Sequence, residues 1–268
     1  MPDQTPSPTA MLRVEGLQKS YGDFETLRDI SFTAKQGELI CIVGPSGCGK
    51  TTLLKSIAGL LTPSGGIVEL DGEPVTGPPK KMAVVFQEYG RSLMPWMTVR
   101  RNVELPLLRT TPKAERRKLV DDVLDTVGLG AAGDKFPWQL SGGMQQRVAI
   151  ARAVAYSPEV LIMDEPFAAV DAQTRADLED LVRYIWAKFG VTVLFVTHDI
   201  DESVYLGQRV IVLSMTPTVV QEDLTIDLPD DRDQLTTRAL PRFTELRTHV
   251  YAQIQKAKRD HEQRPDAA

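Results

Sequence analysis

The sequence has few cysteines, no excess of positive charge and no long apolar run. Cys41 and Cys48 are the two cysteines among 268 residues, so no disulfide framework is expected and a reducing, cytoplasmic compartment fits. The net charge of −5 disfavours a general nucleic-acid binder, which is more often basic. The strongest apolar runs, ELICIVG and VTVLFV, have the length of strands. They fall short of the roughly 18–20 residues of a membrane span, so any spanning is expected from another chain.

The pattern of residues changes along the chain and divides it into parts. Residues 1–10 have neither an apolar core nor a basic leader, which predicts a disordered tail and not a signal peptide. Between residues 11 and 225, strand patterns alternate with helical ones. This alternation predicts an α/β domain with a mainly parallel sheet covered by helices. Within it, residues 88–157 are almost entirely helical in pattern and are interpreted as an inserted helical subdomain.

Residues 226–268 form a C-terminal extension whose pattern is the least informative. Four apolar side chains at helical spacing predict one docking helix there. These side chains are Phe243, Leu246, Val250 and Ile254. The last residues, KAKRDHEQRPDAA, are polar and are expected to be a frayed tail.

The segment GPSGCGKTT, residues 44–52, follows an apolar strand and precedes a helical pattern. It matches the phosphate-loop pattern G-x-x-x-x-G-K-[ST], in which glycines let backbone N–H groups turn towards phosphate oxygens. Lys50 is predicted to reach the β- and γ-phosphates of ATP, and the Thr51 hydroxyl to bind Mg²⁺. Cys48 is expected to line the loop, where its thiol would make the site sensitive to alkylation. The predicted nucleotide contacts are Gly44, Pro45, Ser46, Gly47, Cys48, Gly49, Lys50, Thr51 and Thr52.

Polar side chains follow three predicted strands at the edge where open α/β sheets bind their ligands. After VLIMD, Asp164 is predicted to hold Mg²⁺ and Glu165 to orient or polarise the attacking water. His198 ends the next apolar strand and is predicted to contact the γ-phosphate. Gln87 ends the strand 82–87, and its amide is predicted to touch both Mg²⁺ and the water. The alternatives are solvated acids, a structural histidine and a glutamine that caps its strand.

A second anion site is indicated by LSGGMQQR, residues 140–147. Ser141, Gly142 and Gly143 precede a helical pattern, and a helix start with free N–H groups and no bulk before it suits an anion. A single chain that already has a phosphate loop has no evident use for this second site.

The order of these segments resembles the ATP-binding subunits of ABC (ATP-binding cassette) transporters. The resemblance covers about residues 11–225 and rests on the phosphate loop, Gln87, LSGGMQQR, MDEP, Asp171 and His198. It implies a P-loop NTPase fold, with a RecA-like core, a small antiparallel β-subdomain and an inserted helical subdomain. It also implies a head-to-tail dimer of two copies. Ser141, Gly142 and Gly143 of one copy would then close over the γ-phosphate held by the other, which explains the second anion site.

The resemblance implies roles for two further residues. Tyr21, in KSYG, matches the aromatic residue that stacks on adenine, and an ordinary strand-end tyrosine is the alternative. Asp171 matches the residue that links the two sites across the dimer.

The sequences of residues 86–103 and 199–214 resemble those of the ATP-binding subunits of importers of nitrate, sulfonates and taurine. In this family the first segment is where a membrane subunit docks, and Pro95-Trp96-Met97 would present an apolar patch. Burial of Trp96 within the helical subdomain is the alternative. The expected partners are polytopic permease subunits and, indirectly, a solute-binding protein. The chain itself is expected to lie peripherally on the cytoplasmic face of the inner membrane. An exporter subunit and a soluble ABC-type ATPase of repair or translation are the alternative functions.

Overall fold

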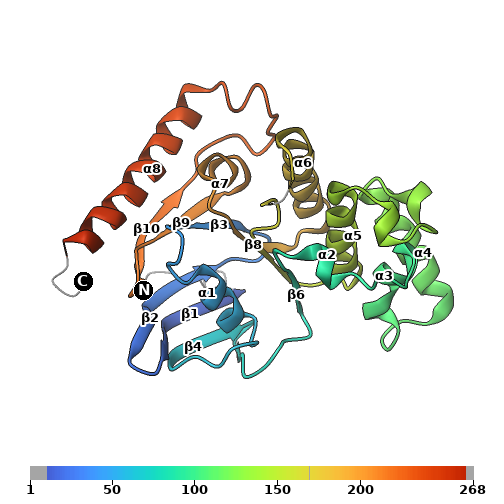
Figure 1. Ribbon diagram of the computed structural model, residues 1–268, viewed down its shortest axis with the longest axis horizontal. Coiled ribbons are helices and arrows are strands. Elements are labelled where there is room, and N and C mark those ends of the chain that lie inside the picture. The colour runs from blue at the N-terminus through green and yellow to red at the C-terminus, as the bar shows by residue number, and fades with distance from the viewer. Residues whose placement is uncertain (1–10, 169, 264–268) are drawn as a thin grey trace, which may run out of the picture.

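Two sheets of different kinds organise the chain, which a computed structural model describes over residues 11–168 and 170–263. The predicted tail, residues 1–10, lies outside the described residues. The smaller sheet is antiparallel and has the strand order β2-β1-β4-β5. Its strands are β1 (Leu12–Tyr21), β2 (Phe24–Ala34), β4 (Gly65–Leu70) and β5 (Glu73–Pro74). It lies below the larger sheet in Figure 1.

The larger sheet carries the carboxyl edge at which the site is predicted. Its order is β10-β9-β3-β8-β7-β6, and β10 is the one strand of this sheet that runs antiparallel to its neighbour. The strands are β3 (Leu39–Val43), β6 (Met82–Val85), β7 (Val160–Asp164), β8 (Thr192–Val196), β9 (Arg209–Leu213) and β10 (Val220–Thr225). All residues of β3, β7 and β8 are buried, which explains their continuous apolar sequences. The predicted α/β sheet is therefore confirmed.

Successive residues of the central strand belong to different cores. Leu39 and Cys41 of β3 face a core built with the larger helices, whereas Ile40 and Ile42 face a core shared with the antiparallel sheet. This alternation follows from the two-residue period of a strand. The helices on the two faces are α1 (Lys50–Ile57), α5 (Gly142–Ala155), α6 (Ala172–Phe189), α7 (Ile200–Leu206) and α8 (Pro241–Glu262).

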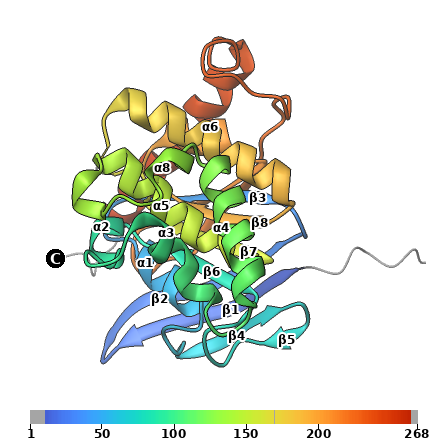
Figure 2. The ribbon, with the colours of Figure 1, turned by 90° about the vertical axis from the view of Figure 1, so that its right-hand side faces the viewer.

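Between residues 88 and 157 the described secondary-structure elements are all helical. They are α2 (Tyr89–Ser92), α3 (Val99–Glu104), η1 (Leu105–Leu107), α4 (Lys113–Thr126), η2 (Gly130–Ala132), η3 (Pro137–Gln139) and α5. Figure 1 shows α3 and α4 at one end of the molecule, and Figure 2 views the molecule from that end. This placement agrees with the interpretation of these residues as an inserted subdomain. The boundaries of the subdomain remain a prediction.

The segment 214–219, between β9 and β10, connects the two sheets and the phosphate loop. Thr218 forms two backbone hydrogen bonds with β2. The Thr218 N–H donates to Thr26 O at 3.0 Å, and the Arg28 N–H donates to Thr218 O at 2.8 Å. The Thr218 hydroxyl donates to Cys48 O, and the Thr216 hydroxyl donates to Gly47 O at 3.2 Å. The phosphate loop is therefore held from outside by a segment far along the chain.

The C-terminal extension contains the predicted helix, which is longer than expected. The four predicted side chains are all buried on α8, which packs against α7, β9 and β10. The expected frayed tail is wrong for residues 256–262, because α8 continues to Glu262. Ala257, buried in this segment, extends the apolar stripe by one more turn and explains the continuation.

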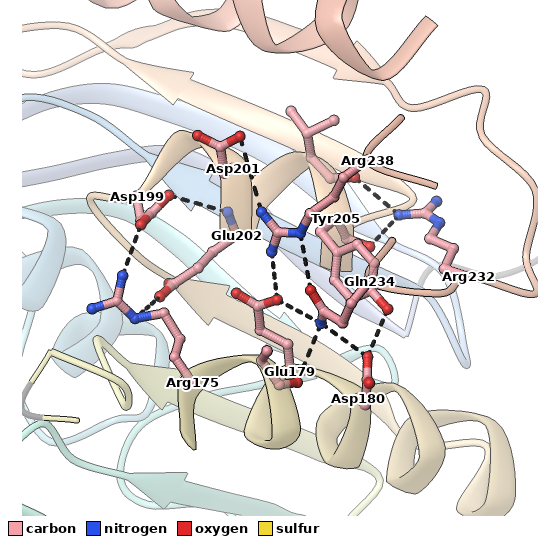
Figure 3. Close-up of polar contacts among 12 residues, drawn as sticks. Arg175, Glu179, Asp180, Asp199, Asp201, Glu202, Tyr205, Arg232, Gln234 and Arg238 are labelled. Atoms are coloured by element: carbon pink, nitrogen blue, oxygen red, sulfur yellow. Dashed lines mark hydrogen bonds and ion pairs between the residues drawn. The ribbon is translucent and has the colours of Figure 1, made fainter. Parts of the chain in front are cut away.

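A cluster of charged and polar side chains fastens the extension to α6 and α7 (Figure 3). Glu179 of α6 is 1% exposed and accepts from Arg238 Nη2 at 2.6 Å and from Gln234 Nε2 at 2.9 Å. Burial raises the pKa of Glu179, and Arg238 opposes that rise. Arg232 Nη1 donates to the carbonyl oxygens of Tyr205 at 2.6 Å and Gly207 at 3.0 Å. These bonds satisfy carbonyl groups at the end of α7 that have no partner within the helix.

Arg238→Met is expected to lower the free energy of unfolding by roughly 3 kcal/mol, because it leaves a buried carboxylate without its cation. Urea denaturation at pH 7.5 and at pH 5 measures this loss. It should shrink at the lower pH, where Glu179, whose pKa burial already raises, takes up a proton in the variant. Arg242→Met is the control, because Arg242 pairs with Asp227 and Glu245 in exposed positions, and such pairs contribute below about 1 kcal/mol. Equal losses in both variants would contradict the role given to burial.

Candidate functional site

The phosphate loop turns from β3 into α1 in a conformation that requires glycine. Gly47 and Gly49 have φ angles of 79° and 91°, which glycine adopts without steric cost. A Cβ on Gly49 would also lie 2.9 Å from Thr26 Cγ2. Gly49 directly precedes α1, so the unpaired N–H groups of the first helical turn lie beside the loop, where a phosphate group fits.

Lys50 and Thr51 open α1 on the side of the sheet edge. Lys50 is 7% exposed, and its ammonium donates to Gly44 O at 3.0 Å and to Pro45 O at 3.2 Å. Thr51 is exposed, as is Ser46 of the loop, and Thr52 is half-buried. The loop thus combines a buried cation with an exposed hydroxyl, as a site for a metal–nucleotide complex requires.

The side chain of Cys48 does not line the loop on its open side, so this expectation is wrong. Cys48 is fully buried and belongs to the core shared with the antiparallel sheet. A Cβ on Gly44 would lie 2.9 Å from its sulfur. Burial raises the pKa of the thiol, which removes the thiolate that alkylation needs. The expected sensitivity to alkylation is therefore not supported by the structure.

Asp164 ends β7 and has the features of a cation ligand. It is 5% exposed, and its Oδ1 has no hydrogen-bond partner among the described residues. Burial raises the pKa of its carboxyl, while a hydrogen bond from the Thr51 side chain lowers it. An orphaned buried carboxylate oxygen beside a hydroxyl fits Mg²⁺, which prefers oxygen ligands and takes others from phosphates. No cluster of three or more His, Cys, Asp or Glu that could hold a metal occurs in residues 11–168 and 170–263.

Glu165 contacts residues from three other segments at the sheet edge. Its Oε2 lies 3.1 Å from His198 Nδ1 and 3.4 Å from Gln87 Nε2. Its Oε1 lies 3.8 Å from the ammonium of Lys50. Gln87 follows β6 by two residues rather than ending it, and His198 follows β8 in the same way. Strands that stop earlier than expected leave both side chains in loops, where they can turn towards one carboxylate.

The backbone of Glu165 is unusual and was not predicted. Its φ angle is 43°, in the left-handed region that costs a non-glycine residue free energy. Its N–H donates to Val196 O at 2.9 Å, so the neighbouring strand holds this conformation. No local sequence signal indicates this feature, because it depends on a strand that is distant in the chain.

The segment 140–147 forms a helix start, as predicted, but not beside the phosphate loop. Ser141 precedes α5 as its N-cap, and its Oγ accepts from Met144 N–H at 3.3 Å. Gly142 and Gly143 are the first helical residues. A Cβ on Gly143 would lie 2.4 Å from Thr174 Cγ2 of α6. In the described part of the chain, no hydrogen bond or ion pair joins these residues to the phosphate loop.

Asp171 has a role within its own chain as the N-cap of α6. Its Oδ1 accepts from Thr174 N–H at 3.0 Å and its Oδ2 from the Thr174 hydroxyl at 2.7 Å. These bonds lower the pKa of its carboxyl. Asp171 is exposed, and Ser141 is exposed at the neighbouring helix start. Two capped and exposed helix starts therefore lie side by side, free to meet another surface.

Tyr21 ends β1 with an exposed ring. The ring is 51% exposed, and the ammonium of Lys19 lies 5.2 Å from its centroid. Opposite it on β2, Phe24 is 62% exposed. Phe24 was not predicted as a site residue, although its place across the hairpin from Tyr21 was a signal that could have identified it.

No helix within residues 11–168 and 170–263 is both long enough and apolar enough to cross a membrane.

Comparisons with known proteins agree on one family. The ABC transporter family model matches residues 27–168. A nitrate import ATP-binding protein of Synechocystis sp. is 47% identical over 213 residues, which cover 79% of each chain. A bicarbonate transport ATP-binding protein of Synechococcus elongatus is 43% identical over 255 residues, which cover 92% of this chain and 38% of that one. A solved dimeric ATP-binding cassette, in a post-hydrolysis state bound to ADP and Pi, has a TM-score of 0.70 at 33% identity, with 81% of this chain and 99% of that one covered.

Proposed function

The chain belongs to the ABC transporter family as an ATP-binding subunit with ATPase chemistry, and we propose that it drives the import of a small anion. The observation that carries the ATPase mechanism is the contact of Glu165 with His198, Gln87 and Lys50 at one edge of the sheet. The importer relatives named above support import over export. The solute proposed is of the nitrate and bicarbonate class, small and singly charged. Sulfonates, and taurine through its sulfonate group, are the other candidates.

The residues around Glu165 divide the work of hydrolysis between them. Glu165 is proposed to orient and polarise the attacking water, and His198 to contact the γ-phosphate. Lys50 pairs with the β- and γ-phosphates, and Thr51, Gln87 and Asp164 are placed to hold Mg²⁺. When bound, the metal neutralises part of the phosphate charge. The phosphate-loop amides and the ring of Tyr21 would hold the rest of ATP.

The two exposed helix starts suit a second copy of the chain. Ser141, Gly142 and Gly143 of one copy would contact the γ-phosphate held by the partner, and Asp171 would lie at the seam. The dimeric cassette with 33% identity supports this arrangement. It also gives the second anion site a ligand, because the first turn of α5 has free N–H groups for a phosphate.

An apolar patch formed by Pro95, Trp96 and Met97 is proposed to dock a polytopic permease subunit. Trp96 is 71% exposed, which disfavours its alternative as a buried residue. The fully buried Asn102 holds the loop beneath it, with Nδ2 donating to Met97 O and Thr98 O at 3.1 Å. A large exposed aromatic ring on a fixed loop binds at low entropic cost. The proposed docking would hold the chain peripherally on the cytoplasmic face of the membrane. A solute-binding protein would act through the permease, and no nucleic-acid partner is proposed.

The test is recovery of partners by tagged Glu165→Gln chain from detergent-solubilised native membranes, followed by mass spectrometry. The expected result is a polytopic membrane protein, whose companion binding protein then identifies the solute. Trp96→Ser should lower that recovery at least about tenfold, because hot-spot aromatic residues contribute over about 2 kcal/mol. Tyr251→Ser, which alters a 54% exposed ring on α8, should leave it unchanged. Recovery of ribosomal or repair proteins alone would instead favour the soluble ABC-type ATPase.

A further inference from the structure

His198 has an exposed ring but a firmly held backbone. Its side chain is 57% exposed, with its ring against Glu165. On one side, the buried Thr197 donates its N–H to Ile42 O at 3.1 Å. On the other side, Asp199 N–H donates to Thr197 Oγ1 at 2.9 Å. The backbone on both sides of His198 is therefore fixed by hydrogen bonds, and the ring extends from it to Glu165.

A buried carboxylate holds this turn from the following helix. Glu202 of α7 is 4% exposed, and its Oε2 accepts from the Thr197 hydroxyl at 2.5 Å. Its N–H donates to Asp199 Oδ1 at 3.2 Å. Burial raises the pKa of the Glu202 carboxyl to about 7, and the Thr197 hydrogen bond and the Arg175 guanidinium oppose that rise. The contacts with Thr197 and Arg175 therefore favour the ionised form of Glu202, which burial disfavours.

Arg175 reaches both acids from α6 (Figure 3). Its Nη1 donates to Asp199 Oδ2 at 3.2 Å, and its Nε lies 3.4 Å from Glu202 Oε1 in an ion pair. Its N–H donates to Asp171 O at 2.9 Å, which places it in the first turn of α6. The Arg175 guanidinium therefore connects the start of α6 with Asp199, which follows His198. It also connects that start with Glu202, whose carboxylate holds Thr197, the residue before His198.

We propose that Arg175 and Glu202 are positioning residues for His198, which transmit the position of the α6 start to the imidazole. Within the described residues, no hydrogen bond or ion pair joins either side chain to Glu165, so both act through Thr197 and Asp199. In the proposed dimer, Asp171 at the start of α6 lies at the seam. Closure of the two copies would then reach His198 through Arg175. The inference rests on the proposed ATPase role of the site.

The test is a double-mutant cycle between Arg175→Gln and His198→Ala in the purified full chain, with Mg²⁺ and ATP. Arg175→Gln is expected to lower kcat about tenfold, because small misplacements of a reacting group are costly. KM for ATP should stay within about twofold of the wild-type value, because the lost contact acts in hydrolysis and not in ATP binding. In the His198→Ala background, single-turnover rates should show no further loss from Arg175→Gln, since the group it positions is gone. Glu202→Gln should give the same pattern, and it carries the test if Arg175→Gln fails to fold.

The outcomes separate the inference from the proposed function. Equal fold-losses from Arg175→Gln in both backgrounds, or none in either, would overturn the positioning role. A wild-type chain without ATPase activity, or a His198→Ala variant that keeps the wild-type kcat, would instead overturn the proposed role of His198. Arg116→Gln is the matched control, because Arg116 pairs with Glu104 in a partly buried position on α4. It should leave kcat unchanged.

Discussion

Replacement of Glu165 with glutamine is expected to lower the rate of ATP turnover about a thousandfold while ATP still binds. The amide keeps the shape of the side chain and a contact with His198, but it cannot accept a proton from water. If the proposed dimer closes on ATP and opens on hydrolysis, ATP should then hold two copies of this variant together. Phosphate release measures turnover, and light scattering with ATP and Mg²⁺ measures the mass of the complex.

Glu159→Gln is the control for this result. Glu159 precedes the same strand, β7, at its opposite end, and its carboxylate pairs with Lys81 at 3.2 Å in an exposed position. Turnover should be unchanged in this variant. A Glu165→Gln chain that stays monomeric with ATP and Mg²⁺ would argue against a site shared between two copies.

Lys50→Met should lower the affinity for ATP about a hundredfold and abolish measurable turnover. The change removes a charge-assisted contact worth about 2–3 kcal/mol, and Lys50 is the buried cation of the phosphate loop. Equilibrium binding of a fluorescent ATP analogue measures the affinity. Lys81→Ala, which breaks exposed ion pairs with Asp71 and Glu159, should bind as the wild type does. Wild-type affinity in Lys50→Met would mean that the loop does not hold the phosphates.

Local patterns were sufficient for much of the fold and for the membership of the site. The buried strands β3, β7 and β8 were predicted because their sequences are almost entirely apolar. Asp164, Glu165 and His198 were predicted because they lie at or just after the ends of such strands. The edge of a parallel sheet then brings them together without further information.

Features that depend on distant segments were not predicted. The burial of Cys48 results from packing against the antiparallel sheet, and a loop sequence alone carries no record of that contact. The capping roles of Ser141 and Asp171 within their own chain were missed because a second role was already assigned to them. The connection of Arg175 with Asp199 and Glu202 joins two helices through side chains. The spacing of apolar residues along the sequence does not predict such contacts.

The attachment of segment 214–219 has a consequence for how the molecule unfolds. Because Thr218 is bonded to β2 and to the carbonyl of Cys48, the antiparallel sheet cannot detach without freeing the phosphate loop. The two sheets, which also share one of the two cores, should therefore open as one cooperative unit. Any ligand that binds the loop stabilises that whole unit by mass action. The amides of β2, which touch no phosphate in the proposed site, should then exchange their hydrogens more slowly whenever ATP is present.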